Sequence, residues 1–224
     1  MKALLLLGSP REKSVSRMLG EALLARLAQR GFESAALRLT GLMEAQEGRA
    51  RLSGEFLGAD LVILASPVYV DAPPAPVMRA LEFLAGEPSS RGSDGARPRR
   101  FTAVFSCGFP EAGHTDLCLD VCRLFARDAG LAWSGGLGVG GAGALDPSGL
   151  HKRAGMAAGL RRALDLSAAS LAAGGNVPQE ARELAARPLA PRWLYLLMAE
   201  AGWLVQAFKR GALFKLGDKP YGKP

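Results

Sequence analysis

The chain has 224 residues, of which 49% are hydrophobic and 22% charged, a composition typical of a soluble globular protein. Its length suffices for one α/β core and an appendage. No run reaches the roughly 18 uncharged apolar residues that cross a bilayer, which argues against a membrane-spanning protein. The apolar run near the N-terminus is too short for a signal peptide. With three cysteines, too few for a disulfide framework, we expect a cytoplasmic location.

The formal net charge of +7 lies entirely in the C-terminal third of the sequence. Residues 151–224 carry 12 Lys and Arg against 5 Asp and Glu, whereas the two kinds balance over 1–150. Such a basic segment suits an anionic membrane surface, a nucleic acid or an acidic partner, and equally a solvated surface rich in arginine. Because no aromatic and basic residues interleave on a recognisable nucleic-acid module, we expect no nucleic-acid partner.

The first elements of the chain frame a turn rich in hydroxyl groups. The apolar run at 3–7 predicts a strand buried on both faces, and an amphipathic helix is predicted at 15–30. The turn between them carries three hydroxyls and a guanidinium, from Ser9, Arg11, Ser14 and Ser16. Together with the free N–H groups of the helix N-terminus, they would seat a phosphate. An ordinary turn in which Ser14 only caps the helix is the alternative.

Strands and helices then alternate along the chain. Further strands are predicted at 32–39, 61–65, 101–105 and 131–139. Helices are predicted at 77–84, 115–129 and 150–173, with a partial helix within 40–58 and a loop at 86–100. This alternation predicts an α/β fold, a parallel sheet with right-handed crossovers.

The C-terminal part differs, because no strand follows the Gly174-Gly175 break. We therefore divide the chain into a domain at 1–173 and a helical extension with a basic tail at 174–224. The extension holds a short helix near 178–186 and an apolar helix at 193–208, followed by Lys209, Arg210, Lys215, Lys219 and Lys223. We expect the apolar helix to pack mainly on protein, across its own domain or in a homodimer. Peripheral contact with a membrane, favoured by its aromatic and lysine-rich flanks, is the alternative.

Two motifs resemble a known family. Gly8-Ser9-Pro10-Arg11 with Ser14 and Ser16, and then ADLVILASPVY at 59–69, resemble the NADPH-dependent FMN reductase and NAD(P)H:quinone oxidoreductase family of the flavodoxin-like superfamily. The similarity covers roughly residues 1–138. It implies a doubly wound, five-stranded parallel sheet in the order 2-1-3-4-5, with FMN as the cofactor and NAD(P)H as the co-substrate.

The resemblance also implies where the cofactor would bind, since open α/β sheets bind ligands at the carboxyl ends of their strands. The first loop would hold the FMN phosphate, the second would line the isoalloxazine, and the third would offer N–H groups to its pyrimidine edge. Phe109 would cover the dimethylbenzene rim. The implied cofactor-binding residues are Ser9, Arg11, Ser14, Val15 and Ser16, then Pro67, Val68, Tyr69 and Val70, then Ser106, Cys107, Gly108 and Phe109.

Other residues that suggest chemistry are given structural interpretations. Asp71 is interpreted as a cap of the following helix, and the three cysteines as small buried hydrophobes. The glycine run at 138–143 satisfies G-x-G-x-x-G, but no helix opens directly after it, so we interpret it as a flexible loop. His114 and His151 lack further candidate ligands, and no metal site is expected.

The function that the resemblance implies is an FMN-dependent NAD(P)H oxidoreductase. Hydride would pass from nicotinamide C4 to flavin N5 and then to a quinone, a free flavin or another small acceptor, with the cofactor carrying the chemistry. No catalytic side chain is expected, and the protein would be a homodimer or homotetramer. The alternative is a flavin-binding electron-transfer protein that serves a protein partner and has no NAD(P)H turnover of its own.

Overall fold

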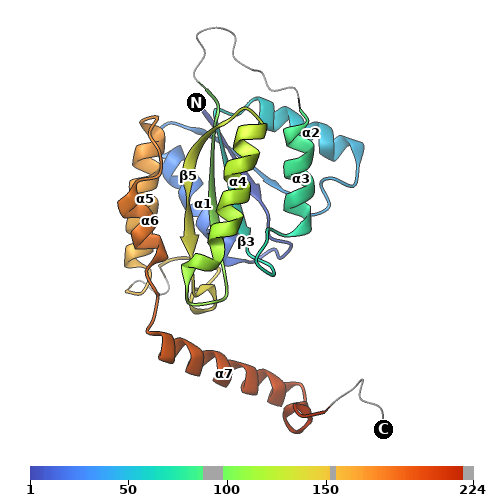
Figure 1. Cartoon of the computed structure of the whole chain (residues 1–224), viewed down its shortest axis with the longest axis vertical. Coiled ribbons are helices and arrows are strands. Elements are labelled where there is room, and N and C mark those ends of the chain that lie inside the picture. The colour runs from blue at the N-terminus through green and yellow to red at the C-terminus, as the bar shows by residue number, and fades with distance from the viewer. Residues whose placement is uncertain (88–97, 152–154, 219–224) are drawn as a thin grey trace. The chain divides into compact units, whose positions relative to one another are not determined.

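The structure, a computed structural model, describes residues 1–87, 98–151 and 155–218. The chain divides into two compact units, Met1–Leu189 and Ala190–Pro224. The first unit holds a parallel sheet covered by helices, and the second holds one long helix (Figure 1).

The sheet of the first unit has five parallel strands in the order β2-β1-β3-β4-β5, which confirms the predicted topology. In chain order the strands are β1 (Lys2–Leu7), β2 (Glu33–Arg38), β3 (Leu61–Pro67), β4 (Arg100–Ser106) and β5 (Ala132–Val139). The inner strands β1, β3 and β4 are buried along almost their whole length. Burial on both faces explains why their sequences are continuous apolar runs rather than alternating ones.

Helices cover both faces of the sheet (Figure 1). Leu5 and Leu7 of β1 pack in one core with α1 (Val15–Ala28), α5 (Ala158–Ala172) and α6 (Gln179–Ala186). Leu4 and Leu6 point to the other face, where α2 (Gln46–Leu57), α3 (Ala75–Ala85) and α4 (Asp116–Asp128) pack. Successive side chains of a strand alternate between faces, so one leucine run supplies both cores.

The first unit extends past the boundary expected at residue 173, because α6 belongs to it. The Val177 N–H donates to the Ser134 carbonyl of β5 at 2.7 Å, and Ala181 and Ala185 of α6 are buried. Small side chains let this short helix lie close to α5 and β5. The unit therefore ends at Leu189.

Two further elements differ from the sequence prediction. Helix α5 begins at Ala158 rather than at 150, and residues 150–151 and 155–157 form turns instead. A 3-10 turn at Ala112–Thr115 also precedes α4. Most of the predicted loop at 86–100 lies outside the described residues, at 88–97.

The second unit consists of α7 (Arg192–Lys209) and a 3-10 turn at Leu213–Lys215. Ala207 is the one buried residue of α7, and the helix's large apolar side chains are at least partly exposed. None of the described helices is both long enough and apolar enough to cross a membrane. Lys219 and Lys223 of the predicted basic tail lie outside the described residues.

Candidate functional site

A cavity of about 480 Å³ opens where β1, β3, β4 and β5 end at one edge of the sheet. The structure brings eleven of the thirteen predicted site residues together around it: Ser9, Arg11, Ser14, Val15, Ser16, Pro67, Val68, Tyr69, Ser106, Cys107 and Gly108. Val70 and Phe109 do not line this cavity. Five further residues do: Lys13, Ala142, Gly143, Leu145 and Pro147.

The N-terminus of α1 forms one wall of the cavity. Ser14 is its N-cap, and its Oγ accepts from the Arg17 N–H at 3.2 Å and lies 3.3 Å from Ser16 Oγ. The Val15 and Ser16 amides in the first turn have no acceptor within the helix. Ser14 therefore caps the helix and also lines the cavity, and its contact with a phosphate stays a prediction.

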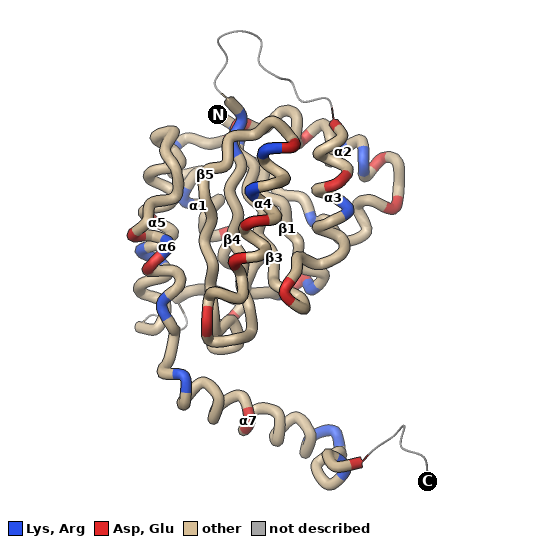
Figure 2. The backbone as a smooth tube through the Cα atoms, in the orientation of Figure 1, with Lys and Arg blue, Asp and Glu red and all other residues tan. Residues whose placement is uncertain are grey.

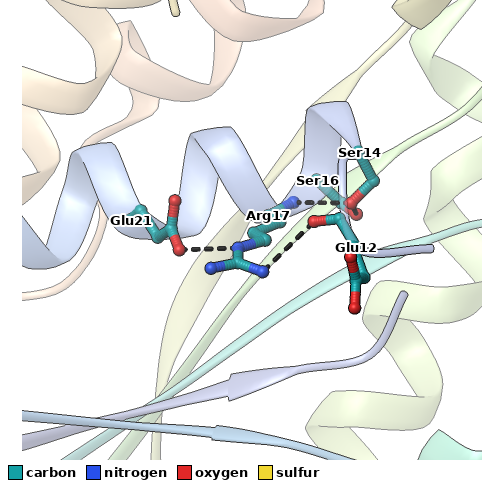
Figure 3. Close-up of polar contacts among 5 residues, drawn as sticks. All are labelled: Glu12, Ser14, Ser16, Arg17 and Glu21. Atoms are coloured by element: carbon teal, nitrogen blue, oxygen red, sulfur yellow. Dashed lines mark hydrogen bonds and ion pairs between the residues drawn. The ribbon is translucent and has the colours of Figure 1, made fainter. Parts of the chain in front are cut away.

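The basic residues of this wall have different roles. Arg17 is held away from the cavity, because its Nε donates to Glu21 Oε1 at 2.7 Å and its guanidinium also donates to the Glu12 carbonyl at 3.2 Å (Figure 3). Arg11 and Lys13 line the cavity, and neither forms an ion pair within the described part of the chain. The positive end of the α1 dipole adds to these two charges, so this wall attracts an anion.

A further arginine, Arg38, stabilises the loop between β1 and α1. Arg38, the last residue of β2, donates from its guanidinium to the Pro10 carbonyl at 2.5 Å and lies 3.6 Å from the Glu12 carboxylate. The Ser9 Oγ accepts from the Arg11 N–H at 3.2 Å. These contacts fix the path of the loop between β1 and α1.

Gly8 allows that loop to start where it does. Its N–H donates to the Ala65 carbonyl at 2.9 Å, continuing the ladder with β3. A Cβ at this position would lie 2.5 Å from Val77 Cγ2 and 2.7 Å from Ser66 Oγ, well inside van der Waals contact. Only a glycine lets the chain turn so close to β3 and α3.

The second loop ends in a tight turn. Tyr69 and Ala72 exchange backbone hydrogen bonds of 2.8 and 3.2 Å, and the two residues between them, Val70 and Asp71, have φ of 50° and 59°. Two successive positive φ values define a type I′ turn. Val70 stands at its tip, 98% exposed, and its contact with the isoalloxazine stays a prediction. Tyr69 does line the cavity.

Asp71 and Phe109 form a separate cluster with His114. The Asp71 carboxylate lies 3.8 Å from His114 Nδ1, and the imidazole stacks on the Phe109 ring at a centroid distance of 4.6 Å. The expected helix cap is wrong, because α3 begins after Pro74 and has no side-chain cap. The Phe109 ring lies against His114 and is 60% exposed; that it covers the rim of the cofactor stays a prediction. The described residues hold no group of three or more candidate metal ligands.

The third loop lines the cavity, but the backbone N–H of Cys107 in this loop is not a free donor. The Cys107 N–H donates to the Val139 carbonyl of β5 at 3.0 Å, so it is not available to a ligand, contrary to the expectation. Its thiol lies 3.4 Å from each of the Phe109 and Glu111 carbonyls, and burial raises the pKa of this thiol. Cys107 therefore stays protonated at neutral pH. Cys118 and Cys122 are buried in the core, as expected.

The glycine run after β5 forms a fourth wall, which sequence reasoning missed. The Ala142 N–H donates to the Cys107 carbonyl at 3.0 Å and the Gly141 N–H to the Phe109 carbonyl at 2.6 Å, so the segment is tied to the third loop rather than free. A Cβ on Gly140 would lie 2.3 Å from the Pro110 carbonyl oxygen. The glycines thus permit close packing. The predicted parallel sheet could have revealed this wall, because the carboxyl end of β5 must lie at the same edge of the sheet as those of the other strands.

Comparison with known proteins agrees with this arrangement. The family model described as NADPH-dependent FMN reductase matches residues 1–114, which is just over half of the chain. The chain belongs to this family. The matched part of this FMN reductase family member contains the first three loops of the cavity. Among curated proteins, none matches the sequence.

Solved structures share the fold. An FMN-dependent NADH-azoreductase from Bacillus anthracis str. Ames Ancestor, in complex with FMN, is 14% identical with a TM-score of 0.55, covering 77% of this chain and 100% of that one. The Trp repressor binding protein from Bacillus subtilis is 11% identical with a TM-score of 0.51, covering 73% and 97%. A flavone reductase is 13% identical with a TM-score of 0.53, covering 76% and 64%. At such identities the likeness establishes the flavodoxin-like fold alone.

The residues around the cavity fit FMN, the cofactor that family membership implies. The helix amides, the Ser14–Ser16 hydroxyl pair and the cations of Arg11 and Lys13 provide donors and charge for a phosphate. The apolar side of the cavity, with Pro67, Val68, Tyr69 and Leu145, suits a flat ring system. A phosphate donor set and an apolar wall in one cavity match the two ends of FMN.

Proposed function

We propose that this protein is an FMN-dependent NAD(P)H oxidoreductase that reduces a small acceptor such as a quinone or a free flavin. The observation that carries the proposal is the combination of an anion seat at the α1 N-terminus and an apolar wall within one cavity. Its volume of about 480 Å³ lies within the range of about 300–1,000 Å³ that small-molecule sites occupy. Family membership supports the same reaction class.

The chain's own residues position and shield the cofactor. Ser14, Ser16 and Arg11 would hold the phosphate, while Val68 and Tyr69 would pack on the ring and exclude water from it. Bound FMN would supply the redox chemistry, accepting a hydride from NAD(P)H and passing reducing equivalents to the acceptor. Among the described residues, the acidic and basic side chains that line the cavity are those of Arg11 and Lys13, so the protein contributes binding, orientation and positive charge.

We further propose that the protein forms a homodimer or homotetramer and works in the cytoplasm. Apolar side chains exposed in the second and third loops support self-association: Tyr69 is 41% exposed, Val70 98% and Phe109 60%. A second copy placed there would shield them from water. Three free cysteines support a reducing compartment.

Absorbance of freshly purified protein and steady-state kinetics test the proposal. We expect flavin absorbance bands, NADH or NADPH oxidation that depends on added quinone, and parallel initial-rate lines when NAD(P)H is varied at several quinone concentrations. Parallel lines follow if both substrates use one site in turn. Bound flavin without NAD(P)H turnover would replace the proposal with the electron-transfer alternative, and protein that neither retains nor binds flavin would refute both.

A further inference from the structure

Helix α7 presents a wide apolar face on which no large side chain is buried. At 100° per residue, Trp193, Leu197, Leu204 and Phe208 form one stripe, with exposed fractions of 68%, 60%, 49% and 71%. A second stripe lies directly beside it, formed by Leu194, Met198, Ala201 and Val205. Together they make a face, here called the α7 apolar face, that is too extensive to be stable in water.

Apart from Glu200, the charges of α7 lie at its two ends. Arg192 begins the helix, Lys209 ends it, and Arg210 follows directly. Glu200, the one acidic residue of the helix (Figure 2), lies next to Trp193 at 100° per residue, with Leu196 and Trp203 on its other side. Over 190–224 there are six Lys and Arg against two Asp and Glu. The surface that covers the apolar face must therefore be apolar and must also accept a rim of positive charge.

The segment after the helix repeats this pairing of apolar and basic residues. Phe214 is 97% exposed and Leu216 63% exposed, with Lys215 between them. Two of the three tryptophans of the chain, Trp193 and Trp203, also belong to α7. Bulky apolar and aromatic side chains beside lysine are typical of segments at the boundary between lipid headgroups and acyl chains.

A second α7 helix is a poorer match for the positive charges at the ends of α7. Two α7 helices packed in parallel would bring Lys209 and Arg210 against their own copies, and antiparallel packing would bring them against Arg192. An anionic lipid surface matches both the apolar face and the basic rim.

We propose that residues 190–218 bind the surface of an anionic lipid bilayer, with α7 lying in the plane of the interface. The apolar face enters the acyl boundary, while Lys209, Arg210 and Lys215 contact headgroup phosphates. An in-plane position agrees with the absence of a membrane-spanning helix among the described residues. This binding goes beyond the proposed oxidoreductase function and does not depend on it.

Vesicle flotation of the full-length protein tests the proposal. Vesicles of phosphatidylcholine with phosphatidylglycerol should float the protein, and phosphatidylcholine alone or high salt should do so much less. The double variant Leu197→Gln/Leu204→Gln should lose about tenfold or more in binding. The matched variant Tyr195→Gln/Ala199→Gln, on the opposite side of α7, should bind like the wild type.

A second pair of variants tests the basic residues separately from the leucines. Lys209→Gln/Lys215→Gln should weaken binding about tenfold, whereas Arg182→Gln/Arg187→Gln, which removes two charges from the first unit, should not. Circular dichroism confirms that each variant is folded. Failure of the full-length protein to float on anionic vesicles overturns the proposal. So does undiminished flotation of the leucine variant, or self-association in sedimentation velocity that the leucine variant abolishes without any vesicle binding.

Discussion

Helices α1 and α7 are both amphipathic, yet only α1 buries its apolar side. Met18, Leu19, Leu23 and Leu27 of α1 are at most 8% exposed, whereas Trp193 and Phe208 of α7 are about 70% exposed, at 68% and 71%. The difference lies in what precedes and follows each helix. Helix α1 connects two parallel strands, so the crossover must return it to the sheet. Helix α7 follows the last strand, as α5 and α6 do, but unlike them it belongs to the second unit.

The largest expected effect is on the free energy of unfolding, and it distinguishes a buried leucine from an exposed one. Leu23→Ala should lower the free energy of unfolding by about 2–5 kcal/mol, because it leaves a cavity between α1 and the sheet. Leu204→Ala in α7 should change it by less than about 0.5 kcal/mol. Urea unfolding followed by circular dichroism measures both. Similar losses for the two variants would show that α7 is covered in solution.

A glycine in each helix provides a second test of the comparison between α1 and α7. A Cβ on Gly20 of α1 would lie 2.4 Å from Ala65 Cβ, while Gly202 of α7 has open space around it. Gly20→Ala should therefore cost about 1–3 kcal/mol in unfolding free energy. Gly202→Ala should cost nothing and instead raise helicity slightly. A Gly20→Ala protein as stable as the wild type would contradict the close approach of α1 to β3.

A smaller effect is expected at the tip of the second loop. Val70 has a φ of 50° and is fully exposed, and a β-branched residue is strained in this conformation. Val70→Asn should raise the free energy of unfolding by about 0.5–1 kcal/mol, since asparagine tolerates positive φ. Val70→Ala, which keeps the strained backbone, is the control. Equal stability of Val70→Asn and Val70→Ala would argue against the type I′ turn.

Sequence patterns predicted the sheet because each strand carries its own signal. The runs at 3–7 and 61–65 read as buried strands, and the hydroxyl-rich turn after the first run predicted the anion seat. The patterns failed where contacts between distant residues determine the local structure. Asp71 looks like a helix cap but lies beside His114, and the glycine run at 138–143 looks flexible but packs tightly on the third loop. The exposure of α7 was not predictable, because amphipathicity does not say what covers a face.

The comparison of FMN with riboflavin, which lacks the phosphate, tests the anion seat most directly. The wild type should bind FMN at least about tenfold more tightly than riboflavin, because charge-assisted hydrogen bonds contribute about 1.5–3 kcal/mol each. Arg11→Ala/Ser16→Ala should remove most of this preference. Arg17→Ala should preserve it, since Arg17 is engaged by Glu21 and Glu12. Equal affinities of the wild type for FMN and riboflavin would contradict a phosphate seat at the N-terminus of α1.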